Sequence, residues 1–459
     1  MIKTDSDLNI FQRRKFTKNV RRRIPWIGHV INDEKLAEDF NINPSTVEIQ
    51  VRAGSMCLAC RGGKLLCGKP RCPALLKLNS FIKVKNRVNS DHLVGSSPPG
   101  IFVGRVGYPY VYAGPLVPPM LGDTSLYDIP ELWHGRTFEE IISFRTNLIR
   151  GKFRVNVSKR SENERFLNLT LDIALSKSPV DTEITFQKRP SGKFFLDNTV
   201  QPMGPSGMLK NMKVANPSTD SRLDKVYGDG DLKAEDAVMN LYLNDVRVSK
   251  IQRAFSIGAF GLKETRRVVP TRWSITAVDS TISRRLIEDK IKGKDLINEY
   301  RVYEFDYLGN RFVILLMPVS WRYEWMEAWF PGTAWNAQSQ SIAMGSDWEG
   351  YRGRTTYASI GGCYYSVRLA VAEFLAKENR QAGVLAMREI YPSFITPLGV
   401  WINRECTRQA FKQKERKFDT LKESLSYINS RFTTGIGVWM KASALLKDAV
   451  HQEKLTKYL

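Results

Sequence analysis

Histidine is scarce in this chain, and its scarcity limits the chemistry that the protein can carry out. The 459 residues include only four, which are widely separated: His29, His92, His134 and His451. A nucleophile–histidine–acid triad needs its histidine beside the other two groups, so a histidine-centred active site is disfavoured. The sequence also lacks a G-x-x-x-x-G-K-[ST] loop. P-loop enzymes cradle phosphates with that loop, so nucleoside triphosphatase activity is disfavoured too.

Long apolar runs are missing as well. No stretch approaches the ~20 apolar residues of a membrane span, and the apolar run at residues 312–319 has only the length of a strand. Residues 1–23 hold a cluster of arginines and lysines but no apolar run, unlike a secretion signal. We therefore expect a cytoplasmic protein with no membrane partner. Because the cytosol is reducing, its cysteines are expected to bind metal instead of forming disulfides.

Acidic residues are too few to balance the basic ones. The chain has 69 lysines and arginines against 47 aspartates and glutamates, a formal net charge of +22. This excess predicts a polyanionic partner. Nucleic acid is the first choice, because clustered cations that bind its phosphates release counterions, which makes the binding favourable. The alternatives are an anionic membrane surface, or a basic protein whose charge serves no partner.

Four of the six cysteines fall within one short segment. They form a C-x2-C-x6-C-x4-C pattern: Cys57, Cys60, Cys67 and Cys72. Four thiolates suit tetrahedral zinc and leave no position open for a substrate, so the pattern predicts one structural Zn²⁺ ion. An iron–sulfur cluster is the alternative, because it also takes four cysteines. The other two, Cys363 and Cys406, are expected in the core.

The chain length predicts more than one domain. We expect a basic arm (1–30), a zinc-knuckle region (31–90), a β-rich part of the core (91–265), an α/β part with the main polar motifs (266–437), and a C-terminal helix with a tail (438–459). The fold class is therefore mixed α/β (α+β). It is a multi-layer core with a small N-terminal four-cysteine zinc knuckle and a helical C-terminal end.

Hydrophobic periodicity locates the expected elements. Strands are predicted at residues 101–103, 110–112, 153–157, 183–186, 300–307, 311–317 and 382–389, within a core whose stretch 153–195 reads as β-rich. Helices are predicted at residues 137–148, 232–243, 364–377, 400–411, 420–432 and 438–450.

Several segments are denser in acidic, basic and aromatic residues than a core requires: 266–280, 321–332, 347–371, 380–394 and 399–408. Unpaired acids among aromatic rings are expected to have raised pKa values, which suits general acid–base catalysis. The candidate catalytic residues are Asp279, Glu327, Asp347 and Glu389. Arginine binds phosphate in a bidentate manner, and aromatic rings stack on unpaired bases. The candidate nucleic-acid-binding residues are Arg272, Trp273, Arg354, Tyr357 and Arg388.

These residues allow more than one function. They fit a pocket for a flipped nucleotide or a nucleotide adduct, and they also fit a nuclease whose carboxylates hold Mg²⁺. In either case the protein would be a hydrolase that acts on DNA or on a nucleotide adduct. The alternative is a buried arginine–carboxylate network that only stabilises the fold.

The sequence ends in HQEKLTKYL, and four of these residues follow the pattern Q-x-x-h-x-x-a-a: Gln452, Leu455, Tyr458 and Leu459. The pattern resembles the clamp-interacting box of replication and repair proteins, which implies binding to a sliding clamp (PCNA). One tight helical turn gathers the apolar residues on one face, while the glutamine bonds at the rim. The last position is leucine where an aromatic residue is more usual. The alternative is that the tail is only the end of the last helix.

Three long strings, VPTRWSITAVD, GRTTYASIGGCYY and RQAGVLAMREIYP, carry a wider resemblance. Together with SPPGIFVGRVGYP, the cysteine cluster and the tail, they make the chain look like the archaeal NreA family of DNA repair proteins. The resemblance implies an archaeal cell, a role in repair of DNA damage, and clamp binding through the terminal box. It brings no settled reaction.

DNA, the clamp and other repair proteins are therefore the expected partners. A non-enzymatic adaptor that binds DNA and the clamp is the alternative to an enzyme. An RNA-binding zinc protein is a further alternative, because zinc knuckles and mixtures of aromatic and basic residues also serve RNA.

Overall fold

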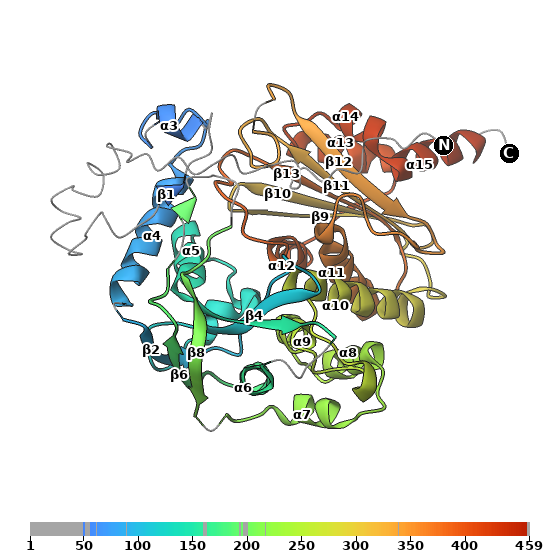
Figure 1. The fold of residues 1–459 in the computed structure, drawn as a ribbon. Helices are drawn as coiled ribbons and strands as arrows, with labels where there is room; N and C mark the ends of the chain where they lie inside the picture. Colours follow the sequence, from blue (N-terminus) through green and yellow to red (C-terminus); the bar gives the residue numbers. More distant parts are fainter. Residues whose placement is uncertain are drawn as a thin grey trace, which may run out of the picture.

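The computed structural model describes residues 49–50, 56–60, 62–88, 90–158, 163–191, 194–195, 201–215, 217–337 and 339–456. Two six-stranded sheets, with helices around and between them, organise these residues (Figure 1). The mixed α/β class and the helical C-terminal end are therefore confirmed. None of the described helices is long and apolar enough to cross a membrane.

The first sheet has the strand order β2-β6-β8-β5-β4-β3. Its strands are β2 (His92–Ser97), β3 (Ile101–Val103), β4 (Tyr110–Val117), β5 (Ile149–Asn156), β6 (Val180–Phe186) and β8 (Ser206–Val214). All pairs are antiparallel except β5 with β8. The helices that go with this part of the chain are α4 (Pro73–Arg87), α5 (Phe138–Asn147), α6 (Glu164–Leu175), α7 (Ser221–Gly228), α8 (Ala234–Leu243) and α9 (Val248–Ser256).

The second sheet has the order β12-β11-β13-β10-β9-β14. Its strands are β9 (Tyr300–Tyr307), β10 (Asn310–Met317), β11 (Arg322–Trp329), β12 (Ala343–Glu349), β13 (Gly383–Ile390) and β14 (Arg416–Phe418). The helices are α10 (Thr271–Leu286), α11 (Gly362–Glu378), α12 (Trp401–Ala410), α13 (Leu421–Arg431), α14 (Ile436–Ala442) and α15 (Ala444–Thr456). Shorter elements are α3 (Met56–Cys60), β1 (Ile49–Gln50) paired with β7 (Phe194–Phe195), the 3-10 turns η3 (Ser125–Asp128), η4 (Pro130–Leu132) and η5 (Lys263–Thr265), and the π-helical turn η6 (Ile287–Ile291).

Helices cover both faces of the second sheet, α10 to α12 on one side and α13 to α15 on the other (Figure 1). Because side chains alternate along a strand, β10 supplies both layers. Phe312, Ile314 and Leu316 join the core with α10 to α12, while Val313 and Leu315 join the core with α13 to α15. This explains why the strand is apolar at almost every position.

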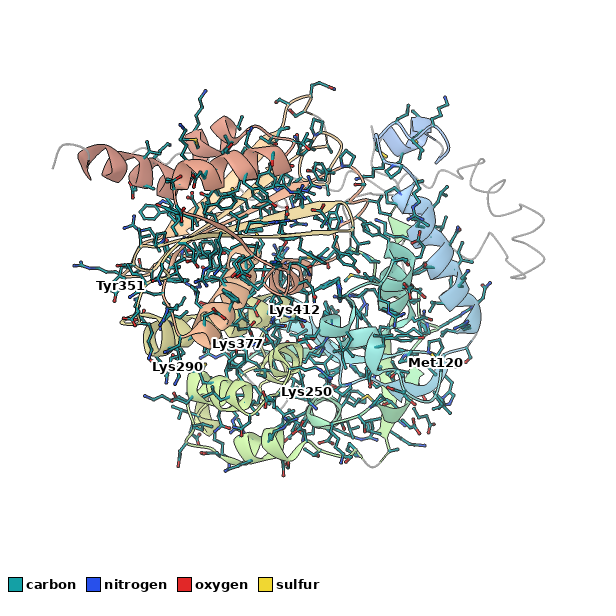
Figure 2. All side chains as sticks on the ribbon, turned by 180° about the vertical axis from the view of Figure 1, so that it is seen from behind. Met120, Lys250, Lys290, Tyr351, Lys377 and Lys412 are labelled. Carbon is teal, nitrogen blue, oxygen red and sulfur yellow. The ribbon has the colours of Figure 1, made fainter. Side chains whose placement is uncertain are left out.

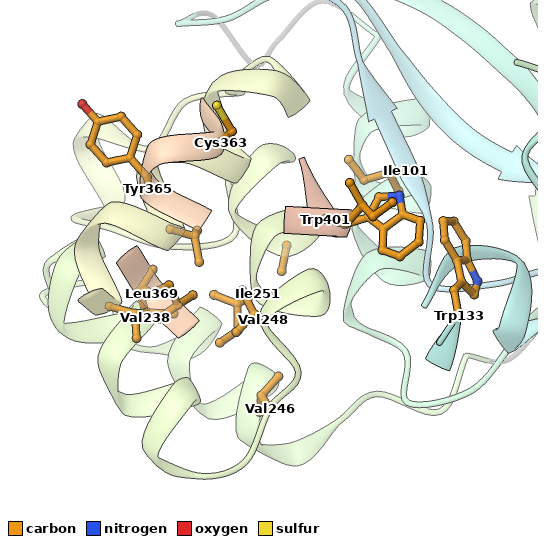
Figure 3. Close-up of a cluster of buried hydrophobic side chains, with 14 of the residues drawn as sticks. Ile101, Trp133, Val238, Val246, Val248, Ile251, Cys363, Tyr365, Leu369 and Trp401 are labelled. Carbon is orange, nitrogen blue, oxygen red and sulfur yellow. The ribbon is translucent and has the colours of Figure 1, made fainter. Parts of the chain in front are cut away.

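One hydrophobic core extends across the boundary expected near residue 265. Figure 3 shows Val238 and Ile251 of α8 and α9 beside Leu369 of α11. Further along, the rings of Trp133 and Trp401 meet edge to face, with centroids 5.0 Å apart. The helices of the first half therefore bury apolar surface against those of the second.

Most predicted elements are confirmed within a residue or two of their ends. The strands predicted at 110–112, 153–157 and 183–186 are longer, as β4, β5 and β6 show, and two further predictions were wrong. The stretch 153–195 contains α6, whose buried Leu167, Leu171, Ala174 and Leu175 recur at helical spacing. The single helix expected at 438–450 is two helices, because Ser443 has an extended backbone and ends α14. Its hydroxyl accepts from the Leu446 amide and starts α15.

Candidate nucleic-acid interface

The four candidate catalytic carboxylates lie on four different elements and do not converge. Asp279 is on α10, Asp347 on β12, Glu327 on β11 and Glu389 on β13. The last two belong to neighbouring strands, but Glu327 is level with Arg388 and not with Glu389, so alternation turns them to opposite faces of the sheet. Among the described residues, no three acidic, histidine or cysteine side chains come close enough together to hold one metal ion. These carboxylates therefore do not fit a Mg²⁺ site.

Asp279 is fully buried in an ionic network between α10 and α12. Its Oδ1 accepts from Arg404 Nη1 at 2.9 Å and from Gln252 Nε2 at 2.8 Å. Arg404 also donates to Glu405, and Glu131 lies 3.8 Å from its Nη2. Burial raises the pKa of Asp279 to about 6, although Arg404 opposes the shift. A pKa near neutrality suits proton transfer, but the Asp279 side chain has no exposed surface of its own.

Glu327 forms a second buried pair, with Arg388. Arg388 Nη1 donates to Glu327 Oε1 at 2.9 Å, and its other nitrogens donate to Asn310. The guanidinium lies over the rings of Phe312 and Phe394. Arg388 was predicted to bind phosphate. It is only 2% exposed, so the structure places it inside the protein.

Glu389 and Glu324 lie on the other face of the second sheet, where they accept hydrogen bonds from backbone amides of the C-terminal segment. Glu389 accepts from the amides of Thr433 at 3.0 Å and Thr434 at 2.6 Å. Glu324 accepts from the amides of Ala444 and Leu445 at 3.0 Å, in the first turn of α15. At α15 the Glu324 carboxylate satisfies free helix amides and interacts favourably with the helix dipole, whereas Glu389 binds amides of the loop between α13 and α14. Both residues thus attach the helical layer to the sheet.

Asp347 and Arg354 shape the loop that leads into α11. Arg354 Nη2 donates to Asp347 Oδ2 at 2.9 Å, and its Nε donates to the carbonyl of Thr356 at 2.8 Å. Asp347 also accepts from the Ser359 amide at 2.6 Å. Burial alone would raise the pKa of Asp347, but the bonds from Arg354 and Ser359 lower it below its usual value. The pair fixes the loop whose exposed side chain is Tyr357.

Three of the five candidate nucleic-acid-binding residues come together at the surface. Arg272 and Trp273 lie exposed in the first turn of α10, and the Tyr357 hydroxyl bonds to Thr276 one turn further on. Tyr108 joins them, with its ring centroid 5.3 Å from that of Trp273. We call Tyr108, Arg272, Trp273 and Tyr357 the α10 cluster. The sequence interpretation missed Tyr108, although the alternating YPYVY string was its signal.

Two helices begin on the side where the α10 cluster lies. Gly362, the first residue of α11, lies against Thr276 of α10, and Arg368 further along α11 donates to Ser280 and Ser283 further along α10. The helices therefore run parallel, and their N-terminal ends point the same way. Free amides and the positive end of the helix dipole favour phosphate at such ends, and Arg272 adds a full charge.

The cysteines of the predicted zinc knuckle lie partly near one another. Cys57 and Cys60 are on α3, and Cys72 precedes α4. Burial raises the pKa of the Cys72 thiol, and the neighbouring Cys57 and Cys60 add to the shift. Four thiols are a donor set that zinc accepts. Among the described residues no three such side chains lie close enough together to hold an ion, so zinc stays a prediction that rests on the spacing of the four cysteines.

The predicted clamp-binding tail lies at the end of the described chain. Gln452 and Leu455 fall in the last turns of α15. Tyr458 and Leu459 lie outside the described residues.

Comparison with known proteins covers almost the whole described chain. Residues 66–336 match a family model described as archaeal Nre, N-terminal, and residues 349–458 match one described as archaeal Nre, C-terminal. The chain is 42% identical over 392 residues to the DNA repair protein NreB of Archaeoglobus fulgidus. This alignment covers 85% of this chain and 97% of the relative. The chain is 37% identical over 376 residues to the DNA repair protein NreA of the same organism, covering 82% and 93%.

A relative from a second organism also carries the name of a DNA repair protein. The DNA repair protein NreA of Haloferax volcanii is 32% identical over 354 residues, covering 75% of this chain and 84% of the relative. No solved structure matches. The two matched segments share the second sheet, since β9 to β11 belong to the first and β13 and β14 to the second.

Proposed function

The chain belongs to the archaeal Nre family, and on this premise we propose that it is a DNA repair protein that binds DNA and a sliding clamp. The names of its relatives support the repair role. The net charge of +22 supports a nucleic-acid partner. Other repair proteins are proposed partners through the clamp.

The observation that carries DNA binding is the α10 cluster. An exposed arginine stands beside exposed rings at the start of a helix, and none of the described carboxylates forms an ion pair with Arg272. Exposed rings and cations together are what single-stranded and unpaired nucleic acid recognises. Trp273 is 45% exposed and Tyr357 63%, so both can contact a ligand without rearrangement.

The test is DNA binding by the full chain and by an Arg272→Ala, Trp273→Ala variant. Fluorescence anisotropy would follow labelled single-stranded and duplex DNA, with labelled RNA of the same sequence for comparison. Arg352→Ala is the control, since Arg352 is also exposed but lies outside the cluster. The double variant should bind DNA at least about tenfold more weakly. Equal binding by all three proteins would remove the cluster from the interface, and tighter binding of RNA would favour an RNA partner.

We propose no catalytic role for Asp279, Glu327, Asp347 or Glu389. Each is engaged by an arginine or by backbone amides, which supports the interpretation of a structural network. The protein is then an adaptor that grips DNA and is held by the clamp. Turnover of adducted DNA by the intact chain with Mg²⁺ would contradict this and restore a hydrolase.

The clamp proposal rests on Gln452, Leu455, Tyr458 and Leu459. Deletion of residues 452–459 should abolish association with the clamp in a pull-down, while DNA binding stays unchanged. If DNA binding is lost too, the tail belongs to the fold instead.

Zinc remains a proposal from the spacing of Cys57, Cys60, Cys67 and Cys72. Metal analysis of the purified chain should find about one zinc per chain, and a Cys57→Ser, Cys72→Ser variant should lose it. Iron, or no metal, would contradict the proposal.

A further inference from the structure

The first sheet has a face that the proposed function leaves unexplained. Along β3, β4 and β5, three cations lie over three aromatic rings. Arg154 Cζ lies 4.9 Å from the ring centroid of Tyr110, Lys152 Nζ lies 5.7 Å from that of Tyr112, and Arg150 Cζ lies 5.3 Å from that of Phe102. We call these three cation–ring pairs the β4–β5 face.

Strand alternation explains how these side chains come to share one face. Val111 and Ala113 of β4, with Phe153 and Val155 of β5, point into the core, and Phe153 packs on Phe166 of α6. The residues between them must point the other way. Tyr110 and Tyr112 are accordingly 39% and 44% exposed, which is unusual for tyrosines that have a core available to them.

The charges on this face are not neutralised locally. Burial lowers the pKa of Arg150, and burial together with Arg150 lowers the pKa of Lys152. No carboxylate of the described chain forms an ion pair with Arg150, Lys152 or Arg154. A partly desolvated group of like charges costs stability, and an anionic ligand would relieve that cost.

We propose that the β4–β5 face is a stacking platform for the unpaired bases of single-stranded DNA. This inference rests on the proposed function and names its substrate class. Tyr110 and Tyr112 are two residues apart on a strand, or about 7 Å, so each ring can take one base of an extended strand. Tyr108, in the turn that precedes β4, contacts Trp273 of the α10 cluster, while the cations follow the phosphates.

The geometry selects against duplex DNA. In a duplex the bases are stacked on one another and their faces are covered, so Tyr110 and Tyr112 could reach only the backbone. The cations would still attract duplex phosphates through a term that does not depend on base exposure. The platform should therefore add affinity for single strands alone.

The experiment compares full-length wild type with a Tyr110→Ala, Tyr112→Ala variant. Anisotropy is measured with a labelled thymidine oligonucleotide and with a duplex of the same length. Tyr351→Ala is the matched control, because Tyr351 is 48% exposed and also lies near a lysine, Lys292. It lies across the molecule from Met120, which follows β4 (Figure 2). Circular dichroism would confirm that both variants are folded.

We expect the double variant to bind the single strand at least about tenfold more weakly, with duplex affinity unchanged within about twofold. The Tyr351 variant should match wild type. If the double variant binds the single strand as tightly as wild type does, the platform is overturned but the proposed function stands. No binding of wild type to either DNA would overturn both. The third outcome concerns anionic vesicles. If wild type and the Tyr351 variant bind such vesicles, the double variant does not, and all three bind DNA equally, the face would be assigned to a membrane surface and the platform would be overturned.

Discussion

Replacing Arg404 by methionine tests whether the acids of the polar motifs are structural. Arg404 is 1% exposed. Its Nη1 lies 2.9 Å from Asp279 Oδ1, its Nε 3.0 Å from Glu405 Oε1, and its Nη2 3.8 Å from Glu131 Oε1. Arg404 is thus shared by three carboxylates that have little or no access to water, of which Glu405 also pairs with Arg408. Methionine fills much of the same space, so the loss of charge dominates the effect.

The expected cost follows from leaving buried charges unpaired. Breaking a buried ion pair by removing one partner costs about 3–5 kcal/mol. The cost should depend on pH, because the pKa of Asp279 is already about 6 and loss of Arg404 raises it further. Below that pKa the folded variant holds a proton that neutralises Asp279, while the unfolded chain has released it. The destabilisation should therefore be smaller at pH 5 than at pH 8.

Urea unfolding of the full chain at both pH values measures the effect. Arg272→Met is the matched control, because the same change at the surface should cost less than about 0.5 kcal/mol. An Arg404→Met, Asp279→Asn variant should recover part of the stability at pH 8. If Arg404→Met unfolds like wild type at both pH values but no longer binds DNA, the network would belong to the functional site and not to the core.

Three further predictions use the same measurements or simple variants of them. The pKa of Asp279, about 6 against a usual 3.8, means that its contribution to stability falls as pH rises from about 4 to about 6, by at most ~3 kcal/mol. Asp279→Asn should lack this fall, and an unchanged pH profile would contradict the assignment. Glu324→Gln should weaken the attachment of α15 and cost about 1–2 kcal/mol in thermal unfolding; no change in Tm would show that the amides of α15 need no charge. Lys152→Ala, Arg154→Ala should make the negative slope of log K against log salt for single-stranded DNA shallower by about 1.4, and an equal slope would exclude both residues from phosphate contact.

Local signals explain the elements that could be predicted from the sequence. The hairpin of β9 and β10 was predictable because two strand-like runs, residues 300–307 and 311–317, flank the short segment Leu308–Gly309–Asn310. The structure gives Leu308 and Gly309 the positive φ of a tight turn. The start of α13 was predictable because Thr420 and Glu423 form a reciprocal capping box. In each case the interactions that decide the structure lie within a few residues of one another.

The sequence by itself therefore determined the mixed α/β class and the family, and it singled out Arg272, Trp273 and Tyr357 as candidate binding residues. Only the tertiary structure decided which charged groups are buried. Asp279 meets Arg404 from 125 residues away, and no local pattern encodes that contact. Tyr108 meets Trp273 in the same non-local way. Burial and pairing depend on which distant elements pack together, and they separate an arginine in the core, such as Arg404, from one exposed at the surface, such as Arg272.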